Sequence, residues 1–166
     1  MKKTLALILV FVLALCAIAC GSETKTGEQT NDGIDWTKYP EKLEDWTIAE
    51  LKTYLRAAGV IVDGDSNMYA LDMSANELEA TGVTAGHIYT NMTDGSIMDI
   101  FMEVRLESLL EELKSAHTVA GIPMDTLLGN FAFSYTGGYN EEHIAAFKKA
   151  IEDLGAHYGV TPDFIG

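Results

Sequence analysis

The segment HIYTNMTDGSIMDIFMEV, residues 87–104, constrains the fold more than any other part of the chain because it predicts a β-hairpin. Asp94-Gly95 lies between two runs rich in β-formers, and an Asp-Gly pair favours a two-residue turn. Such a turn would pair Met92 with Ile97. Both faces of this hairpin are substantially apolar, so we expect other elements to cover part of each face.

Three further segments repeat apolar residues at the three-and-four spacing of amphipathic helices. The segment 47–58 begins with Thr47 three residues before Glu50, which is the spacing of a capping box. The segments 106–117 and 140–158 show the same periodicity, and the second of these begins with an asparagine cap and an acidic first turn. We therefore expect three main helices.

Short strands are predicted at residues 59–62, 68–73 and 127–138, in addition to the hairpin. The order of helices and strands predicts an α+β domain. Its mostly antiparallel sheet of about five strands packs with three main helices, with a crossover around the second helix.

The N-terminus has the layout of an export signal. Lys2 and Lys3 precede an apolar run over residues 5–15, small residues follow, and the chain then turns polar. Because a membrane-spanning helix needs about 20 apolar residues, we interpret this segment as a signal peptide and not as a spanning helix.

Residues 17–20, AIAC, resemble the lipobox of bacterial lipoproteins, although alanine stands at the first position, where leucine is usual. The resemblance implies that residues 1–19 are cleaved and that Cys20 carries a lipid of at least two acyl chains, which anchors stably. It also implies a location on the cell membrane, facing the outside of the cytoplasm. The alternative is an ordinary secretory signal in which Cys20 is incidental.

The rest of the chain divides into a tether and one domain. Residues 20–35 are polar apart from the lipidated cysteine and one isoleucine, and they predict a flexible tether with an average end-to-end distance of about 20 Å. Residues 36–166 are long enough for a single domain with its own core.

Charge and cysteine content exclude several functions. Without Lys2 and Lys3, nine basic residues face twenty-five acidic ones, a formal charge of 9 − 25 = −16. Such a surface repels phosphate backbones, so we expect no nucleic-acid partner. Because Cys16 and Cys20 are the only cysteines, the domain has no disulfide, thiolate metal site or cysteine nucleophile. We expect no cofactor.

Asp63, Asp65 and Asn67 alternate as the first ligands of a calcium loop do, which makes them a candidate weak cation site. The glycine and glutamate that complete such a loop are missing at its sixth and twelfth positions. We favour a polar hairpin loop between the strands predicted at 59–62 and 68–73.

Other candidate chemistry is sparse, and we predict no catalytic residue and no firm metal site. Asp99 and Glu103 share one side of a strand, but about 13 Å separates them, beyond the roughly 5 to 9.5 Å that glycosidase carboxylates need. Gly137-Gly138 could form an anion-binding loop, but the acidic pair that follows favours a plain connection. Surface or capping roles are expected for the widely spaced histidines, His87, His117, His143 and His157.

Aromatic residues are the remaining candidates for binding. Period-two stripes usually form core, but an exposed part would make a platform for a sugar or peptide ligand. The residues concerned are Trp36, Trp46, Phe131, Phe133 and Tyr135.

We expect a lipid-anchored, extracytoplasmic, non-catalytic module that binds a small ligand or an envelope protein. The alternatives are a small envelope hydrolase whose carboxylates converge from separate strands, and a purely structural envelope protein.

Overall fold

The computed structural model describes residues 33–64, 66–74, 78, 83–119, 122–135 and 140–165. Within these residues the chain is an α+β domain, as predicted: three α-helices pack with a six-stranded antiparallel sheet and a small two-stranded sheet. The predicted signal peptide, Cys20, most of the tether and the Gly137-Gly138 loop lie outside the described residues.

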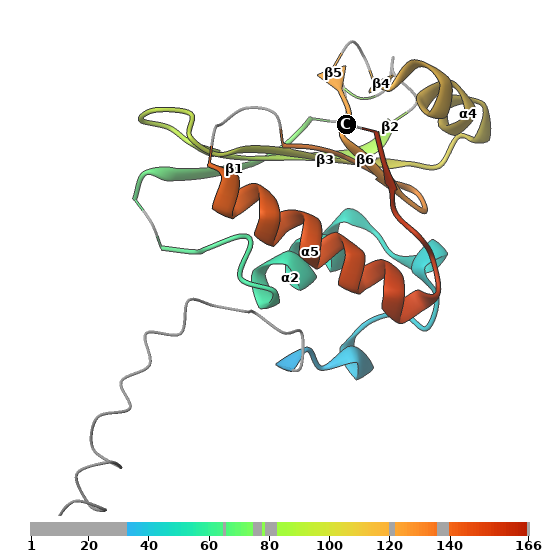
Figure 1. Ribbon diagram of the computed structural model, residues 1–166, viewed down its shortest axis with the longest axis horizontal. Helices are drawn as coiled ribbons and strands as arrows, with labels where there is room; N and C mark the ends of the chain where they lie inside the picture. The colour runs from blue at the N-terminus through green and yellow to red at the C-terminus, as the bar shows by residue number, and fades with distance from the viewer. Residues whose placement is uncertain are drawn as a thin grey trace, which may run out of the picture.

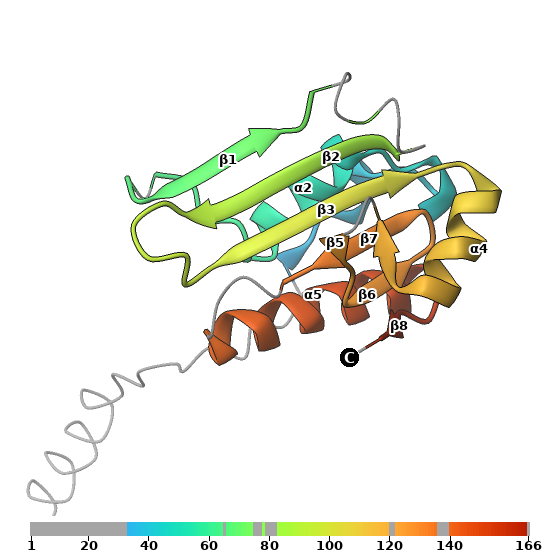
Figure 2. The same ribbon diagram turned by 90° about the horizontal axis from the view of Figure 1, so that it is seen from above.

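The main sheet has the strand order β1-β2-β3-β7-β6-β8, and every neighbouring pair is antiparallel (Figure 2). Strands β3 and β6 are both antiparallel to β7, which lies between them, so they run parallel to each other. The chain passes from β3 to β6 through the helix at Glu107–Ala116, so the predicted crossover around the second helix is confirmed. The strands are β1 (Met68–Asp72), β2 (Val83–Asn91), β3 (Met98–Val104), β6 (Thr126–Leu128), β7 (Phe131–Ser134) and β8 (Asp163–Phe164). The small sheet pairs β4 (Thr118–Val119) with β5 (Ile122–Pro123).

Helices lie on both sides of the sheet (Figure 1). Helices α2 (Ile48–Ala57) and α5 (Glu141–Tyr158) cover one face, which we call the inner face. Helix α4 (Glu107–Ala116) lies with β4 and β5 over one end of the other face, the outer face. Two short 3-10 turns, η2 (Trp36–Lys38) and η3 (Leu43–Asp45), precede α2.

All three predicted helices are confirmed, and two begin as their sequences indicate. Thr47 and Glu50 form the complete capping box at the start of α2. The Asn140 side chain accepts a hydrogen bond from the His143 backbone N–H at 3.1 Å, which caps α5.

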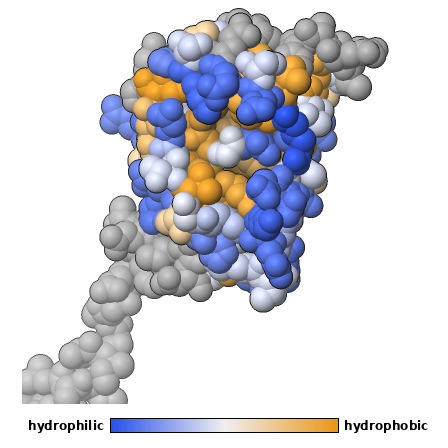
Figure 3. All heavy atoms as spheres, turned by 90° about the vertical axis from the view of Figure 1, so that its right-hand side faces the viewer, coloured by the Kyte–Doolittle hydropathy of each residue, from blue (hydrophilic) through white to orange (hydrophobic). Residues whose placement is uncertain are grey.

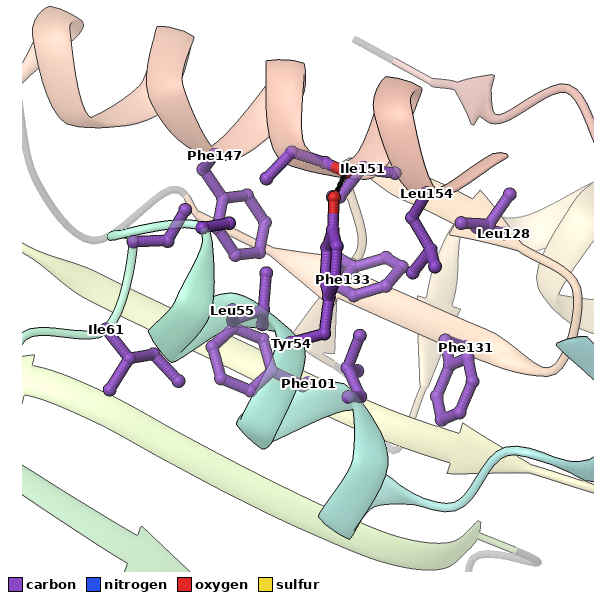
Figure 4. Close-up of a cluster of buried hydrophobic side chains, with 14 of the residues drawn as sticks. Tyr54, Leu55, Ile61, Phe101, Leu128, Phe131, Phe133, Phe147, Ile151 and Leu154 are labelled. Atoms are coloured by element: carbon purple, nitrogen blue, oxygen red, sulfur yellow. Dashed lines mark hydrogen bonds between the residues drawn. The ribbon is translucent and has the colours of Figure 1, made fainter. Parts of the chain in front are cut away.

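Aromatic side chains form the centre of the inner core (Figure 4). Phe101 and Phe133 project from the sheet toward Phe147 of α5, with ring centroids 5.6 and 5.8 Å from the Phe147 ring, and all three are fully buried. The Tyr54 hydroxyl of α2 donates a hydrogen bond to the Ala150 carbonyl of α5 at 2.7 Å. This bond ties the two inner helices to each other.

The prediction that residues 59–62 form a strand is wrong. The N–H groups of Val60 and Ile61 both donate to the Leu55 carbonyl, at 2.9 and 3.2 Å, after Gly59 takes a positive φ of 74°. The segment therefore ends α2, and the side chains of Val60 and Ile61 are buried in the inner core, whereas Val62 is exposed. Strand β1 pairs with β2 and not with this segment, so the predicted hairpin around DGDSN is also wrong.

The hairpin of β2 and β3 is confirmed, but its predicted register is wrong by one residue. Thr90 pairs with Met98, and the Asn91 N–H donates to the Ile97 carbonyl at 3.0 Å, where the prediction paired Met92 with Ile97. The turn is longer than two residues, and only the glycine of the Asp-Gly pair takes a positive φ. Because a slip of one residue exchanges the faces of a strand, the predicted pairing would place the side chains of one strand on the wrong side of the sheet.

The predicted strand at 127–138 contains a second hairpin that the sequence analysis missed. Gly129, with a φ of 57°, and Asn130 connect β6 to β7. Strand β8, near the C-terminus, was missed as well; it has only two residues and pairs with β6 at the edge of the sheet.

Candidate functional site

The outer face of the sheet is apolar and carries no charged side chain from β1 across to β6. Strand register places one set of residues there: Tyr69, Leu71, Gly86, Ile88, Thr90, Met98, Ile100, Met102, Val104, Leu127, Ala132 and Ser134. A charge-free face of this extent is unusual on a chain in which 22% of residues are charged. Such a composition is typical of a surface that packs against another part of the protein or against a binding partner.

One end of the outer face is covered. Met102, Val104 and Ala132 are buried in a cluster that also contains Leu113 of α4 and Val119 of β4. Figure 1 shows α4, β4 and β5 above this end of the sheet. This part of the face is therefore ordinary core.

The other end, nearer the β2–β3 turn, remains exposed to solvent. Tyr69 is 43% exposed, Leu71 45% and Met98 38%. The neighbouring Ile88, Thr90 and Ile100 are half-buried. We call these six residues the open outer face. Exposed apolar patches of this kind commonly mark sites of interaction.

Strand β1 forms the rim of the open outer face and is an edge of the sheet (Figure 2). The Met73 N–H donates to Gly86 at 2.9 Å, and the Asn67 carbonyl accepts from Met92 at 2.8 Å. Because antiparallel pairing alternates, the N–H and C=O groups of the even-numbered residues of β1 point away from β2. The strand contains no proline and no lysine, the residues that commonly protect a sheet edge.

The inner face differs because it carries buried charges. Asp99 of β3 and His143 of α5 form a hydrogen-bonded pair in which the His143 Nε2 lies 2.7 Å from the Asp99 Oδ2, with the Asp99 side chain 1% exposed and the His143 side chain 12% exposed. Burial raises the pKa of Asp99, against the effect of the His143 hydrogen bond and charge. The Asp99 Oδ1 has no hydrogen-bond partner among the described residues. The pair attaches the first turn of α5 to the sheet.

A second polar cluster on the inner face connects β1, β2 and α2. The Asp72 Oδ1 lies 2.7 Å from both the Lys52 Nζ and the His87 Nδ1. The Lys52 and His87 hydrogen bonds lower the pKa of Asp72. Burial lowers the pKa of His87, whose side chain is 3% exposed, more than Asp72 raises it. The prediction of a surface or capping role is therefore wrong for His87.

Glu103 has a structural role at the start of α2. Its Oε2 accepts a hydrogen bond from the Ile48 N–H at 2.9 Å, and its Oε1 accepts from the Arg105 Nε at 2.6 Å. Arg105 in turn donates to the Glu44 and Trp46 carbonyls. Asp99 and Glu103 do share one face of β3, as predicted, but each is held by a different helix.

A surface cleft of about 560 Å³ lies between η3, the β6–β7 turn and the end of α5. Its lining includes Glu41, Lys42, Glu44 and Asn130, and the first three are exposed. The volume suits a small molecule. Figure 3 shows the α4 end of the molecule, where apolar residues form a band that hydrophilic residues flank.

The predicted aromatic platform does not exist as an exposed surface. Trp46, Phe131 and Phe133 are fully buried, and Tyr135 is 6% exposed. Trp36 is half-buried and stacks on His157, with ring centroids 3.8 Å apart. The aromatic stripe faces α5 and therefore forms core.

The candidate cation residues are not brought together as a described site. Asp63 is exposed and lies 3.1 Å from the Arg56 Nε, while Asp65 lies outside the described residues. Among the described residues, no three side chains of His, Cys, Asp or Glu gather closely enough to hold a metal ion. The weak cation site stays a prediction.

Sequence reasoning missed the open outer face. The alternation in YALD pointed to a strand, but only the register and the placement of α2, α4 and α5 decide which side chains remain exposed. In the part of the chain that the structure describes, no helix is long and apolar enough to span a membrane. No protein-family model, curated protein or solved structure matches this chain.

Proposed function

We propose that this protein is a lipid-anchored, extracytoplasmic binding module of the bacterial cell envelope, attached through Cys20, which uses the open outer face to bind a partner. The observation that carries the proposal is the exposure of Tyr69, Leu71 and Met98 on a sheet face without charges. Exposed apolar surface is costly in water, and a binding partner that covers it would contribute about 25 cal/mol per Å².

Binding is favoured over the hydrolase alternative by the partners of the inner-face carboxylates. A hydrolase of that kind needs carboxylates that converge on one substrate. Asp99 is held by α5, while Asp72 and Glu103 are held by α2. These contacts join helices to the sheet and leave the three carboxylates in separate places.

Membrane attachment is tested with the full chain in which Cys20 is replaced by alanine. We expect the wild-type protein to fractionate with membranes and Cys20→Ala to lose that attachment once the signal is cleaved, since the lipid provides the anchor. If cleaved Cys20→Ala still fractionates with membranes, the lipid anchor is the wrong explanation.

The binding surface is tested with Leu71→Lys and a matched control, Leu106→Lys. Both leucines are exposed, 45% and 54%, but only Leu71 belongs to the open outer face. The apolar dye ANS fluoresces on exposed hydrophobic surface. We expect its fluorescence with the native chain to fall in Leu71→Lys and to change little in Leu106→Lys.

The same two variants then identify specific ligands in a thermal-shift screen with sugars and apolar peptides. A ligand that binds the native state raises the melting temperature. A ligand of the open outer face should stabilise Leu106→Lys and fail to stabilise Leu71→Lys. If every stabilising ligand acts equally on both variants, the open outer face is not the binding surface.

A further inference from the structure

Strand β1 is an edge of the sheet, and the side of it that faces away from β2 is open to a partner strand. We infer that a second copy of this chain pairs with β1 in antiparallel orientation, about a twofold axis at Ala70, which joins two open outer faces into one surface. This inference deepens the proposed function and rests on it, since the open outer face is the surface that is extended.

Backbone geometry selects the register of this pairing. The groups that point outward from β1 belong to Met68, Ala70 and Asp72. A twofold axis at Ala70 pairs Ala70 with itself and Met68 with Asp72 of the second copy, so all the outward groups find partners. An axis at Met68 leaves the outward groups of Ala70 and Asp72 without partners, and an axis at Asp72 places two carboxylates directly opposite each other, which is destabilising.

Side chains on the outer face fit the same register. With Ala70 on the axis, Tyr69 lies opposite Leu71 of the second copy, in a pair whose backbones exchange no hydrogen bonds. Side chains approach most closely in pairs of this kind, and aromatic–aliphatic contacts there are favourable. The twofold axis is perpendicular to the sheet, so both open outer faces point to the same side.

The local charge of β1 permits this contact although the whole chain is strongly acidic. Asp72 is the only charged residue of the strand, and it already pairs with the Lys52 Nζ at 2.7 Å. The two Asp72 residues of the pair would be offset by about 13 Å, which exceeds the screening length of about 8 Å at physiological salt. Repulsion then comes mainly from the rest of the acidic surface.

Anchoring would favour the contact as well. Copies tethered to one membrane meet at a far higher effective concentration than copies in dilute solution. Figure 2 shows β1 as the outermost strand of the sheet, with no coloured helix or strand beyond it. The edge is therefore accessible in the described part of the chain.

The test uses the chain from Gly21 onward. Every residue of the two described hydrophobic cores lies at Ile34 or later in the sequence, so this chain retains both cores. Sedimentation equilibrium is measured at about 100 µM protein in about 50 mM and about 500 mM NaCl. We expect a dimer whose population increases with salt, because salt screens the repulsion between two acidic chains. A complex with a basic partner would weaken with salt instead.

Ala70→Pro removes an outward N–H while leaving the β1–β2 hydrogen bonds in place, and proline is tolerated at such edge positions. We expect this variant to be monomeric, with a circular dichroism spectrum like that of the wild type. A wild-type chain that stays monomeric at high salt, or a folded Ala70→Pro that still dimerises, would overturn the inference.

A disulfide test examines the register and does not depend on Ala70→Pro folding. The chain from Gly21 has no cysteine, so Ala70→Cys introduces a single thiol. Facing Cα atoms in a hydrogen-bonded pair lie about 5.5 Å apart, within the range of a disulfide. We expect Ala70→Cys to cross-link about tenfold faster than Ala145→Cys, an exposed control on α5. Equal rates would overturn the twofold pairing.

Failure of this inference is distinguishable from failure of the proposed function. A monomeric chain whose ligand stabilisation is lost in Leu71→Lys would refute the second copy and retain the binding face. A salt-promoted dimer with no ligand response at Leu71 would retain the pairing and refute the use of the open outer face for other ligands.

Discussion

The two faces of the sheet are built from the same strands but differ in charge and in covering. The inner face holds Phe101 and Phe133 together with the buried Asp99, and two helices cover it. The outer face has no charged side chain from β1 to β6, yet its β1 end is exposed. Charged side chains are thus buried on the covered face, whereas apolar side chains are exposed on the open one. A sheet with one face in solvent usually shows the opposite arrangement.

The contrast separates a face that holds the fold together from a face that is free to contact a partner. The two buried carboxylates of the inner face, Asp99 and Glu103, each have a partner on a helix, so these polar groups position α5 and α2. The open outer face has no comparable partner in the described chain, although its side chains are apolar. We conclude that the inner face maintains the fold, and we propose that the outer face binds.

The largest expected difference between the faces is in stability. Phe133→Ala should lower the free energy of unfolding by roughly 3–5 kcal/mol, because it leaves a cavity in the inner core. Tyr69→Ser should change it by no more than about 0.5 kcal/mol, because Tyr69 is exposed. Urea denaturation of both variants measures this difference, and equal losses would contradict the assignment of the two faces.

The Asp99–His143 pair provides the next largest effect. His143→Ala leaves a buried carboxylate without its partner and should cost roughly 3–5 kcal/mol. Asp99→Asn removes the charge and keeps the shape, so it should be clearly more stable than His143→Ala at neutral pH. Chemical denaturation of both variants at neutral pH provides the comparison.

The pH dependence of Asp99→Asn follows from the direction of the Asp99 pKa shift. Burial raises the pKa of Asp99 above its ordinary value of 3.8, so the stability from its protonated form is present below about 3.8 and is lost as pH rises through the folded pKa. The stability of Asp99→Asn relative to the wild type should therefore increase with pH over that interval. A constant difference from pH 3 to pH 7 would show that Asp99 is not desolvated.

His87 should produce the smallest effect, visible mainly as a pH dependence. Burial lowers the pKa of His87 below its ordinary value of 6.5. The stability associated with neutral His87 is present above about 6.5 and is lost as pH falls toward the folded pKa. His87→Gln should make the melting temperature less dependent on pH in this interval. His117→Asn, at an exposed helix end, should leave the pH dependence unchanged. Identical pH profiles for all three chains would contradict the account.

Local patterns in the sequence predict the helices because periodicity and caps agree there. Thr47 and Glu50 form their capping box, and Asn140 caps α5 as its sequence indicates. The β2–β3 hairpin is predicted correctly, but its register is not. Both of its faces are apolar, so hydrophobic alternation does not distinguish one register from the next.

Tertiary packing explains the remaining differences. Val60 and Ile61 have the composition of a strand, but their N–H groups are used to end α2. The aromatic stripe ending at Tyr135 is core because α5 covers it. The open outer face depends on where α4 stops along the sheet, which no local pattern encodes.

Hydrogen exchange at β1 tests the central claim most directly. The amides of Met68, Ala70 and Asp72 point away from β2, so they should exchange rapidly in a dilute sample of the chain from Gly21. In the full chain isolated with membranes, to which we propose that Cys20 attaches it, a partner at this edge should slow exchange at these three amides and leave those of α5 unchanged. Equally rapid exchange at β1 in both samples would contradict the claim that this edge and the open outer face form an interaction surface.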